Sequence, residues 1–280
     1  MSRRKVSVII PNYNYARFLG QAIESVLSQS FGNLELIVVN NGSSDNSLEV
    51  LQKYKREIII VNQSNLGQSG ARNSGLSQAR GDLISFLDAD DYWEIDKLER
   101  QISLLNCDTQ LVYCGITPFD NADLTKKSPI MPKYKGDCSE DFYRQPGASI
   151  VLSGESTAIF TRELLNKVGL FDSNLNSTAG WDFFRRCSRF TKFDFVSESL
   201  VNYRLHSTNM SNSNIGVIRD MRLAYIKFFN DSDWKIPNKA KHKTNRALEW
   251  SYFKTFLKCR NFRLAMISGF NLVKECSKSF

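Results

Sequence analysis

Short apolar runs alternate with amphipathic segments through the first hundred residues. The runs are rich in β-branched residues and predict four strands, at residues 6–10, 34–39, 58–61 and 83–87. Between them, apolar residues recur at helical spacing and predict three helices, near residues 18–27, 48–54 and 71–79. Repeated strand–helix units are typical of an α/β protein whose mostly parallel sheet is covered by helices on both faces.

The pattern is less regular after residue 100 and becomes helical after residue 214. In the middle we expect strands at residues 111–116, 193–196 and 201–205, and short helices at residues 162–168 and 180–190. Beyond it, helical spacing predicts three further helices, at residues 218–229, 239–257 and 262–273. We therefore divide the chain into three parts, residues 1–100, 101–214 and 215–280, of which the last is a helical extension.

The composition is that of a globular protein. The 280 residues include 42% apolar and 24% charged residues, which excludes wholesale disorder. No apolar run approaches the roughly 18 residues of a spanning helix. The run at residues 6–10 is too short for a secretion signal, so we expect a cytoplasmic protein.

The charge is unevenly distributed along the chain. The formal net charge is +8, and residues 215–280 carry 14 Lys and Arg against 5 Asp and Glu. The body of the chain is therefore close to neutral, which does not favour nucleic acid as a partner.

Polar segments follow the four predicted strands of the first part, at residues 11–14, 40–45, 62–67 and 88–91. Ligands of parallel α/β sheets bind outside the carboxyl ends of the strands, so these segments are the expected site. Asp88, Asp90 and Asp91 follow the last of these strands, and carboxylates two residues apart can reach one divalent cation that is shared with a diphosphate. Taken alone, this short pattern favours a solvated acidic turn.

Four sequence blocks together resemble family 2 glycosyltransferases of the GT-A fold. They are VSVIIPNYN at residues 6–14, LIVVNNGSSD at residues 36–45, NLGQSGARNSG at residues 65–75 and ISFLDADD at residues 84–91. Three later blocks also fit, GLFD at residues 169–172, GWD at residues 180–182 and YRLH at residues 203–206. The resemblance covers roughly residues 5–212. It implies that residues 1–100 bind a nucleotide sugar and that residues 101–214 bind the acceptor, as two halves of one Rossmann-like domain.

The resemblance implies a nucleotide pocket, a metal site and a base. The nucleotide-binding residues would be Pro11, Asn12, Tyr13, Asn41, Arg72 and Asp88. Asp90 would ligate the Mn²⁺ or Mg²⁺ that is bound to the diphosphate, and His206 matches a further metal or phosphate contact. Asp182 matches the general base.

The implied activity is transfer of a sugar, with inversion, from a nucleotide-diphosphate sugar to a hydroxyl acceptor. A metal would stabilise the charge that grows on the leaving diphosphate, and a carboxylate would take the proton of the attacking hydroxyl. Attack opposite the leaving group requires no covalent nucleophile. The resemblance favours a UDP-sugar as the donor and a carbohydrate or glycolipid acceptor, as in the synthesis of cell-surface polysaccharide or glycolipid.

Two positions depart from the family pattern. The pair after the second strand usually includes an Asp, and here it is Asn40-Asn41, whose neutral oxygens are weaker acceptors for a base N–H. The usual Glu-Asp pair at the base is Trp181-Asp182, and Trp181 either packs on an acceptor sugar or belongs to the core. The asparagine pair leaves open an alternative function, a non-catalytic nucleotide-sugar-binding module descended from such an enzyme. Asp88, Asp90 and Asp182 favour the enzyme.

The basic helical extension has two interpretations. Its helices carry apolar residues beside lysines and arginines, which is compatible with a hairpin that packs on the rest of the protein. The same pattern is compatible with peripheral contact with an anionic membrane at its inner face, because anionic lipids attract clustered Lys and Arg.

Overall fold

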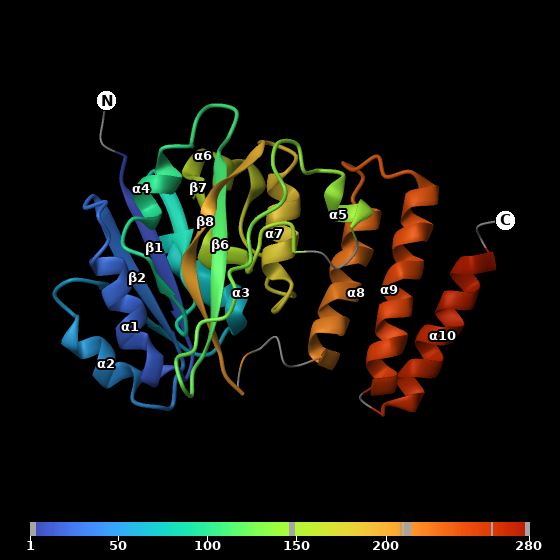
Figure 1. Cartoon of the computed structure of the whole chain (residues 1–280), viewed down its shortest axis with the longest axis horizontal. Helices are drawn as coiled ribbons and strands as arrows, with labels where there is room; N and C mark the ends of the chain where they lie inside the picture. The colour runs from blue at the N-terminus through green and yellow to red at the C-terminus, as the bar shows by residue number, and fades with distance from the viewer. Residues whose placement is uncertain (1–3, 146–148, 208, 210–213, 259, 278–280) are drawn as a thin grey trace. The chain divides into compact units, whose positions relative to one another are not determined.

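The computed structural model describes residues 4–145, 149–207, 209, 214–258 and 260–277 (Figure 1). The chain forms two compact units. Residues 1–138 and 149–207 make up the sheet unit, and residues 139–148 and 208–280 make up the helical unit.

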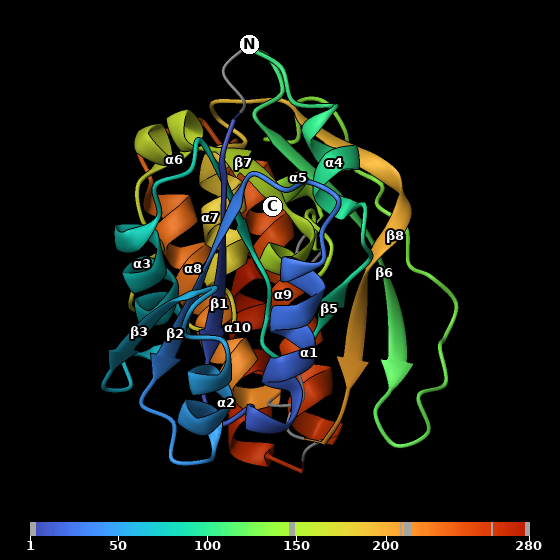
Figure 2. The ribbon, with the colours of Figure 1, turned by 90° about the vertical axis from the view of Figure 1, so that its left-hand side faces the viewer.

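An eight-stranded sheet with the order β3-β2-β1-β4-β7-β6-β8-β5 organises the sheet unit (Figure 2). Its strands are β1 (Val6–Asn12), β2 (Leu34–Asn41), β3 (Ile59–Gln63), β4 (Leu83–Phe86), β5 (Tyr92–Trp93), β6 (Leu111–Asp120), β7 (Ile159–Thr161) and β8 (Phe193–Leu205). The pairs β1–β2, β1–β4, β2–β3 and β6–β8 are parallel. Strand β7 is antiparallel to β4 and β6, and it joins the two parallel halves.

Helices cover both faces of the first half of the sheet. They are α1 (Ala16–Leu27), α2 (Ser47–Lys53) and α3 (Gly67–Gln78). Val6, Val8 and Ile10 of β1 share a buried cluster with residues of α1. The intervening Ile9 points to the other face, where a Cβ on Gly75 of α3 would lie 2.3 Å from Ile9 Cγ2. Because Gly75 has no side chain, α3 packs directly on β1.

The second half of the sheet unit contains the helices α4 (Lys97–Ile102), α6 (Arg162–Val168) and α7 (Ala179–Cys187), and the 3₁₀ turn η1 (Gly154–Thr157). An aromatic cluster fixes α7, because the Phe183 ring stacks on Phe171 at 4.4 Å between centroids and contacts Phe160 of β7 at 5.1 Å. Asn73 of α3 exchanges hydrogen bonds of 2.9 and 3.0 Å with the main chain of Phe171. These contacts bring the start of α7 near α3.

The helical unit consists of α5 (Asp141–Arg144), α8 (Asn214–Asn230), α9 (Asn238–Lys258) and α10 (Phe262–Ser277). The short α5 is anchored by its carbonyls, which accept hydrogen bonds from Tyr225 Oη at 3.1 Å and from Thr244 Oγ1 at 2.6 Å. Arg222 links α8 to the other two long helices, since it bonds Glu249 of α9 and Ser268 of α10, both at 2.6 Å. No helix within the described residues combines the length and apolarity that crossing a membrane requires.

The predicted fold class is confirmed by this sheet and its flanking helices. All four strands expected in the first hundred residues are present, as are the three helices expected after residue 214. The structure adds β5, β7, α4 and α5, which are between two and six residues long. Such short elements carry too few residues to show a periodicity.

Candidate active site

The acidic turn after β4 lies at the carboxyl end of the parallel strands, as expected for a ligand site. The Asp91 amide donates to the carbonyl of Asp88 at 3.1 Å and closes the turn. The Asp91 side chain is buried, and its Oδ1 accepts the main-chain N–H of Arg204 at 3.0 Å. Burial, followed by repulsion from Asp90 and Asp88, raises the pKa of Asp91 well above its usual range. The turn therefore concentrates negative charge, which favours a cation.

The two residues expected to bind a metal lie together. His206 Nε2 is 3.0 Å from Asp90 Oδ2, and the His206 side chain is only 3% exposed. Its ring packs against Tyr15 and Phe18 at centroid distances of 5.6 and 5.1 Å. Burial and the neighbouring Asp88 raise the pKa of Asp90, although the hydrogen bond from His206 opposes them. A buried carboxylate and a buried imidazole thus share one position at the turn.

Arg204 holds this arrangement and was not identified from the sequence. Its Nε donates to the carbonyl of Asp90 at 2.7 Å, and its Nη1 donates to Asn121 Oδ1 at 3.0 Å. The guanidinium lies over the ring of Phe18 at 4.4 Å and over that of Phe119 at 4.6 Å. The sequence feature that could have identified Arg204 is its position in the YRLH block at residues 203–206. Because its guanidinium donors are bonded to the protein, Arg204 holds the acidic turn in place.

Arg72 lies between two acidic side chains. It is buried, and its Nη2 is 3.4 Å from Asp88 Oδ1. Its Nη1 is 2.8 Å from Oε1 of Glu155, a residue that the sequence analysis did not select. Glu155 is the only charged residue between Arg144 and Arg162, and this feature of the sequence could have identified it as a candidate site residue. Asp88, Arg72 and Glu155 thus form a row of alternating charge, with the side chain of Asp88 29% exposed.

The residues expected around the base have different surroundings. Tyr13 is 46% exposed and Asn12 is buried, with its Nδ2 donating to Ser43 Oγ at 3.2 Å. Asn41 is also buried, and its Nδ2 donates to Asn65 Oδ1 at 3.2 Å and to the Gly67 carbonyl at 3.1 Å. Its Oδ1 accepts from Gln63 Nε2 at 2.8 Å and from the Leu66 amide at 2.9 Å.

All four hydrogen bonds of Asn41 fasten the segment that leads from β3 into α3. The half-buried Pro11 lies in β1, beside Asn12. Pro11, Asn12 and Asn41 therefore form the base of the expected nucleotide site at the ends of β1 and β2, while Tyr13 is the most exposed side chain of this set.

Asp182 lies on α7 and is buried, with both carboxylate oxygens in ion pairs. Oδ1 accepts from Arg185 Nη2 and Oδ2 accepts from Arg186 Nε, each at 2.9 Å. Arg186 in turn donates to the carbonyls of Val168 at 2.6 Å and Leu170 at 3.0 Å, at the end of α6. The role of Asp182 as a base stays a prediction, because its contacts equally fasten α7 to α6. Trp181 is half-buried.

The available donor atoms fit a metal that is shared with a diphosphate. Among the described residues, no three His, Cys, Asp or Glu side chains gather to hold a metal ion. Asp90 and His206 provide one carboxylate and one imidazole at 3.0 Å from each other. Carboxylate oxygens and imidazole nitrogens are ordinary Mn²⁺ ligands, and phosphate oxygens and waters commonly complete such a shell.

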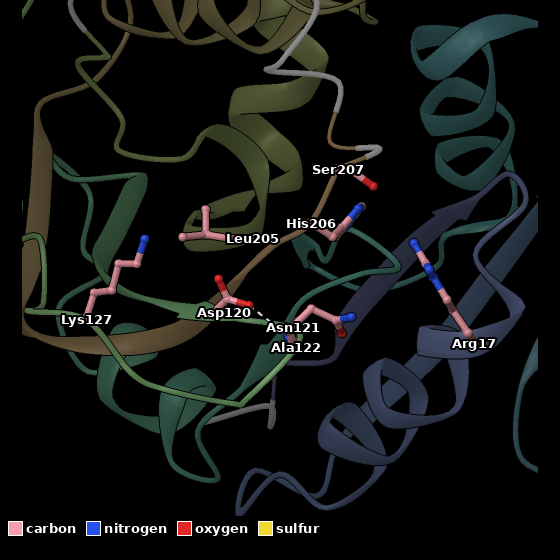
Figure 3. A pocket seen from close by; sticks show the side chains of 8 residues that line it. All are labelled: Arg17, Asp120, Asn121, Ala122, Lys127, Leu205, His206 and Ser207. Carbon is pink, nitrogen blue, oxygen red and sulfur yellow. Dashed lines mark hydrogen bonds between the residues drawn. The ribbon is translucent and has the colours of Figure 1, made fainter.

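A cavity of about 420 Å³ adjoins His206 (Figure 3). Arg17 and Lys127 line it from different sides, and the loop at Asn121 contributes to its wall. Asp120 also lines the cavity, so its ionised lining carries two positive charges against one negative charge, which favours an anionic ligand.

Comparison with known proteins identifies the family to which the chain belongs and supports the fold. Residues 7–169 match the family model Glycosyl transferase family 2. An uncharacterized glycosyltransferase of Nostoc sp. is 35% identical over 213 residues, which cover 73% of this chain and 66% of the relative. An uncharacterized glycosyltransferase of Rickettsia typhi is 31% identical over 230 residues, which cover 80% and 71%. The chain belongs to glycosyl transferase family 2, and it spans about two thirds of the length of these relatives.

Two solved structures share the fold. Staphylococcus aureus TarS 1–349 in complex with UDP-GlcNAc has a TM-score of 0.65 and 19% identity, over 90% of this chain and 72% of that one. The mannosyltransferase PcManGT of Pyrobaculum calidifontis in complex with GDP-Man and Mn²⁺ has a TM-score of 0.64 and 16% identity, over 100% and 88%. The expected GT-A fold of a glycosyltransferase is therefore confirmed.

Proposed function

We propose that the protein is a metal-dependent inverting glycosyltransferase that uses a nucleotide-diphosphate sugar. One observation carries the proposal: Asp88, Asp90, His206 and Arg72 meet at the carboxyl ends of the parallel strands, and Asp90 is 3.0 Å from His206. This is where a parallel sheet binds a nucleotide. Carboxylates for a metal and a guanidinium for a diphosphate occur there together.

Each residue has a distinct task in this proposal. Asp90 and His206 would hold Mn²⁺ or Mg²⁺, which when bound would supply Lewis-acid stabilisation of the leaving diphosphate. Asp88, of which 29% is exposed, binds the ribose, and Arg72 provides positive charge for the diphosphate. We assign the exposed Tyr13 to cover the base. A carboxylate takes the proton of the acceptor hydroxyl, and attack opposite the diphosphate inverts the anomeric centre.

A UDP-sugar is our first choice of donor, and the comparisons support a nucleotide sugar without selecting the base. The structure of TarS contains UDP-GlcNAc, whereas that of PcManGT contains GDP-Man and Mn²⁺. The acceptor we propose is a hydroxyl of a carbohydrate or glycolipid, as in cell-surface polysaccharide or glycolipid synthesis.

A thermal-shift screen followed by product analysis tests the proposal. UDP-, GDP-, dTDP- and CDP-linked sugars are compared with and without Mn²⁺, because a ligand that binds only the native state raises the melting temperature. We expect the sugars of one nucleotide class to raise the melting temperature, and to raise it further when Mn²⁺ is present. Release of the nucleoside diphosphate then reports turnover, and NMR of the released sugar gives its first-formed anomer. Binding without turnover would support the non-catalytic module instead, and retention of configuration would exclude the inverting mechanism.

We further propose that the helical unit contacts anionic membrane. Met266 and Phe270 of α10 are 70% and 72% exposed, and Ile267 is 44% exposed. Arg263 and Lys258 are exposed in the same helical pair, and each cation near an anionic surface contributes about 1 kcal/mol. We expect the protein to sediment with phosphatidylserine-containing vesicles at low salt and to be released near 1 M salt, where screening is strong. Equal recovery with neutral vesicles would contradict the electrostatic contact.

A further inference from the structure

The structure contains a carboxylate that is better placed than Asp182 to act as the base. We propose, on the basis of the proposed transfer reaction, that Glu155 is the residue that takes the proton from the acceptor hydroxyl. In this assignment Asp182 is a positioning residue that orients α7.

The contacts of Asp182 argue against its release for catalysis. Each of its oxygens accepts a charge-assisted hydrogen bond of 2.9 Å, one from Arg185 and one from Arg186. A base must bring an oxygen within hydrogen-bond reach of the hydroxyl it deprotonates, and here both oxygens already hold arginines.

Glu155 lies beside the residues that bind the donor. It belongs to the turn η1, where the next residue, Ser156, accepts the Asp88 amide on its Oγ at 3.0 Å. Its Oε1 is 2.8 Å from Arg72 Nη1, yet this buried oxygen accepts no hydrogen bond from the described residues. Nε of the buried Arg72 likewise lacks an acceptor among them. Within the described part of the chain, the Glu155 oxygen is thus held only by its ion pair with Arg72, and the buried Nε of Arg72 beside it has no acceptor, as expected where a ligand completes the site.

The start of α7 leaves room for this carboxylate. A Cβ on Gly180 would lie 2.7 Å from Glu155 Cδ and within 2.8 Å of both its oxygens. Real Cβ atoms do not approach a carboxylate so closely, so any side chain at residue 180 would require the Glu155 carboxylate to move away from its present position. Because Gly180 has no side chain, the carboxylate from η1 occupies the space in front of the first turn of α7.

The electrostatic environment of Glu155 is compatible with proton uptake. Burial raises the pKa of its carboxyl, Arg72 opposes the shift, and Asp88 adds to it. A carboxylate whose pKa is raised toward the working pH is a stronger base than an exposed one.

The proposed step is balanced. The acceptor O–H bond breaks, its proton goes to a Glu155 oxygen, and the acceptor oxygen forms a bond to the anomeric carbon. The bond from that carbon to the diphosphate oxygen breaks, and its electron pair leaves with the nucleoside diphosphate. Glu155 later releases the proton to water.

The first test is Glu155→Gln in the full chain, which keeps the shape and removes the base. The probes are the nucleotide sugar selected by the thermal-shift screen, with water as acceptor, and the matching nucleoside diphosphate alone. We expect turnover to fall by about 10²-fold or more, while the Kd of the nucleoside diphosphate changes by less than about threefold. Parallel losses in Kd and turnover would overturn the proposal, because Glu155 would then act only by orienting Arg72.

The second test moves the carboxylate between the two positions. Glu155→Ala should be inactive, and the double variant Glu155→Ala with Gly180→Asp should regain at least tenfold, since the new side chain enters the emptied volume. Gly180→Asp alone should lose activity through the clash with Glu155. Failure of the double variant to regain turnover, with its nucleotide binding intact, would refute the assignment.

The wild-type protein separates this inference from the proposed function. If it neither binds nor turns over any nucleotide sugar, the proposed function fails before the variants are compared. If it is active and Asp182→Asn loses about 10²-fold while Glu155→Gln does not, the base is Asp182 and the inference is wrong.

Discussion

Substitution of Asp182 by asparagine measures what the buried ion pairs of α7 contribute to stability. The variant keeps the shape of the side chain but leaves the buried Arg185 without its carboxylate partner, and it weakens the Arg186 pair that is tied to Val168 and Leu170. Removing one member of a buried pair typically costs about 3–5 kcal/mol, and we expect about 3 kcal/mol because asparagine retains one acceptor. For a unit of this size, that corresponds to a fall in melting temperature of about 6–12 °C.

Thermal unfolding at pH 7, followed by circular dichroism, measures this loss. Glu163→Gln is a matched control, because it neutralises an acid that is paired with Lys167 across one turn of α6, but at an exposed position. The Glu163→Gln control should have the same melting temperature as the wild type. Turnover of the donor is compared at a temperature at which both variants are folded, and the Asp182 variant should retain activity within a few fold.

An unchanged melting temperature combined with a large loss of turnover would refute this reasoning. It would mean that the two ion pairs contribute little to stability and that the Asp182 carboxylate is needed for the reaction. The predicted assignment of Asp182 as the general base would then be supported.

Three further predictions concern the donor half. Asp90→Asn should abolish Mn²⁺-dependent nucleotide binding in calorimetry and yet keep or raise the melting temperature at pH 7. The folded state raises the pKa of the Asp90 carboxyl, so its ionisation at neutral pH costs stability that asparagine does not lose. A lower melting temperature would contradict this reasoning. Gly75→Ala should destabilise the protein by about 1–3 kcal/mol in urea unfolding, since the new methyl would meet Ile9 Cγ2 at 2.3 Å, and the loss in the double variant with Ile9→Ala should be smaller than the sum of the two single losses. Asn41→Asp removes the donor of two hydrogen bonds that hold the segment after β3, so UDP binding should weaken by at least threefold in calorimetry; tighter binding would show that residue 41 contacts the base directly.

The sequence predicts the elements whose residues show a hydrophobic pattern of their own. Runs such as residues 6–10 are β-branched and buried on both faces, and this produces an uninterrupted apolar run. Strand β7 was not predicted, because its three residues run directly into α6 and show no period of their own. The 3₁₀ turn η1 was missed for the same reason.

The site was predictable where its residues belong to contiguous blocks. Asp90 and His206 come from two such blocks, and the structure brings them to 3.0 Å. Glu155 approaches Arg72 from 83 residues away along the chain, and nothing in the local pattern of either residue encodes that contact. The partners of Asp182 lie within four residues of it, but the sequence does not reveal that these arginines hold both of its oxygens.

The close approach of Glu155 to Gly180 has an evolutionary consequence. In relatives that keep the backbone of η1 and α7, a side chain at residue 180 would require the carboxylate of residue 155 to leave the position it has here. The two positions should therefore covary, with an acidic residue at one accompanied by a small or neutral residue at the other. A lineage could move its carboxylate from the helix to the turn only through an intermediate that lacks both, or through one in which the carboxylate of residue 155 is displaced.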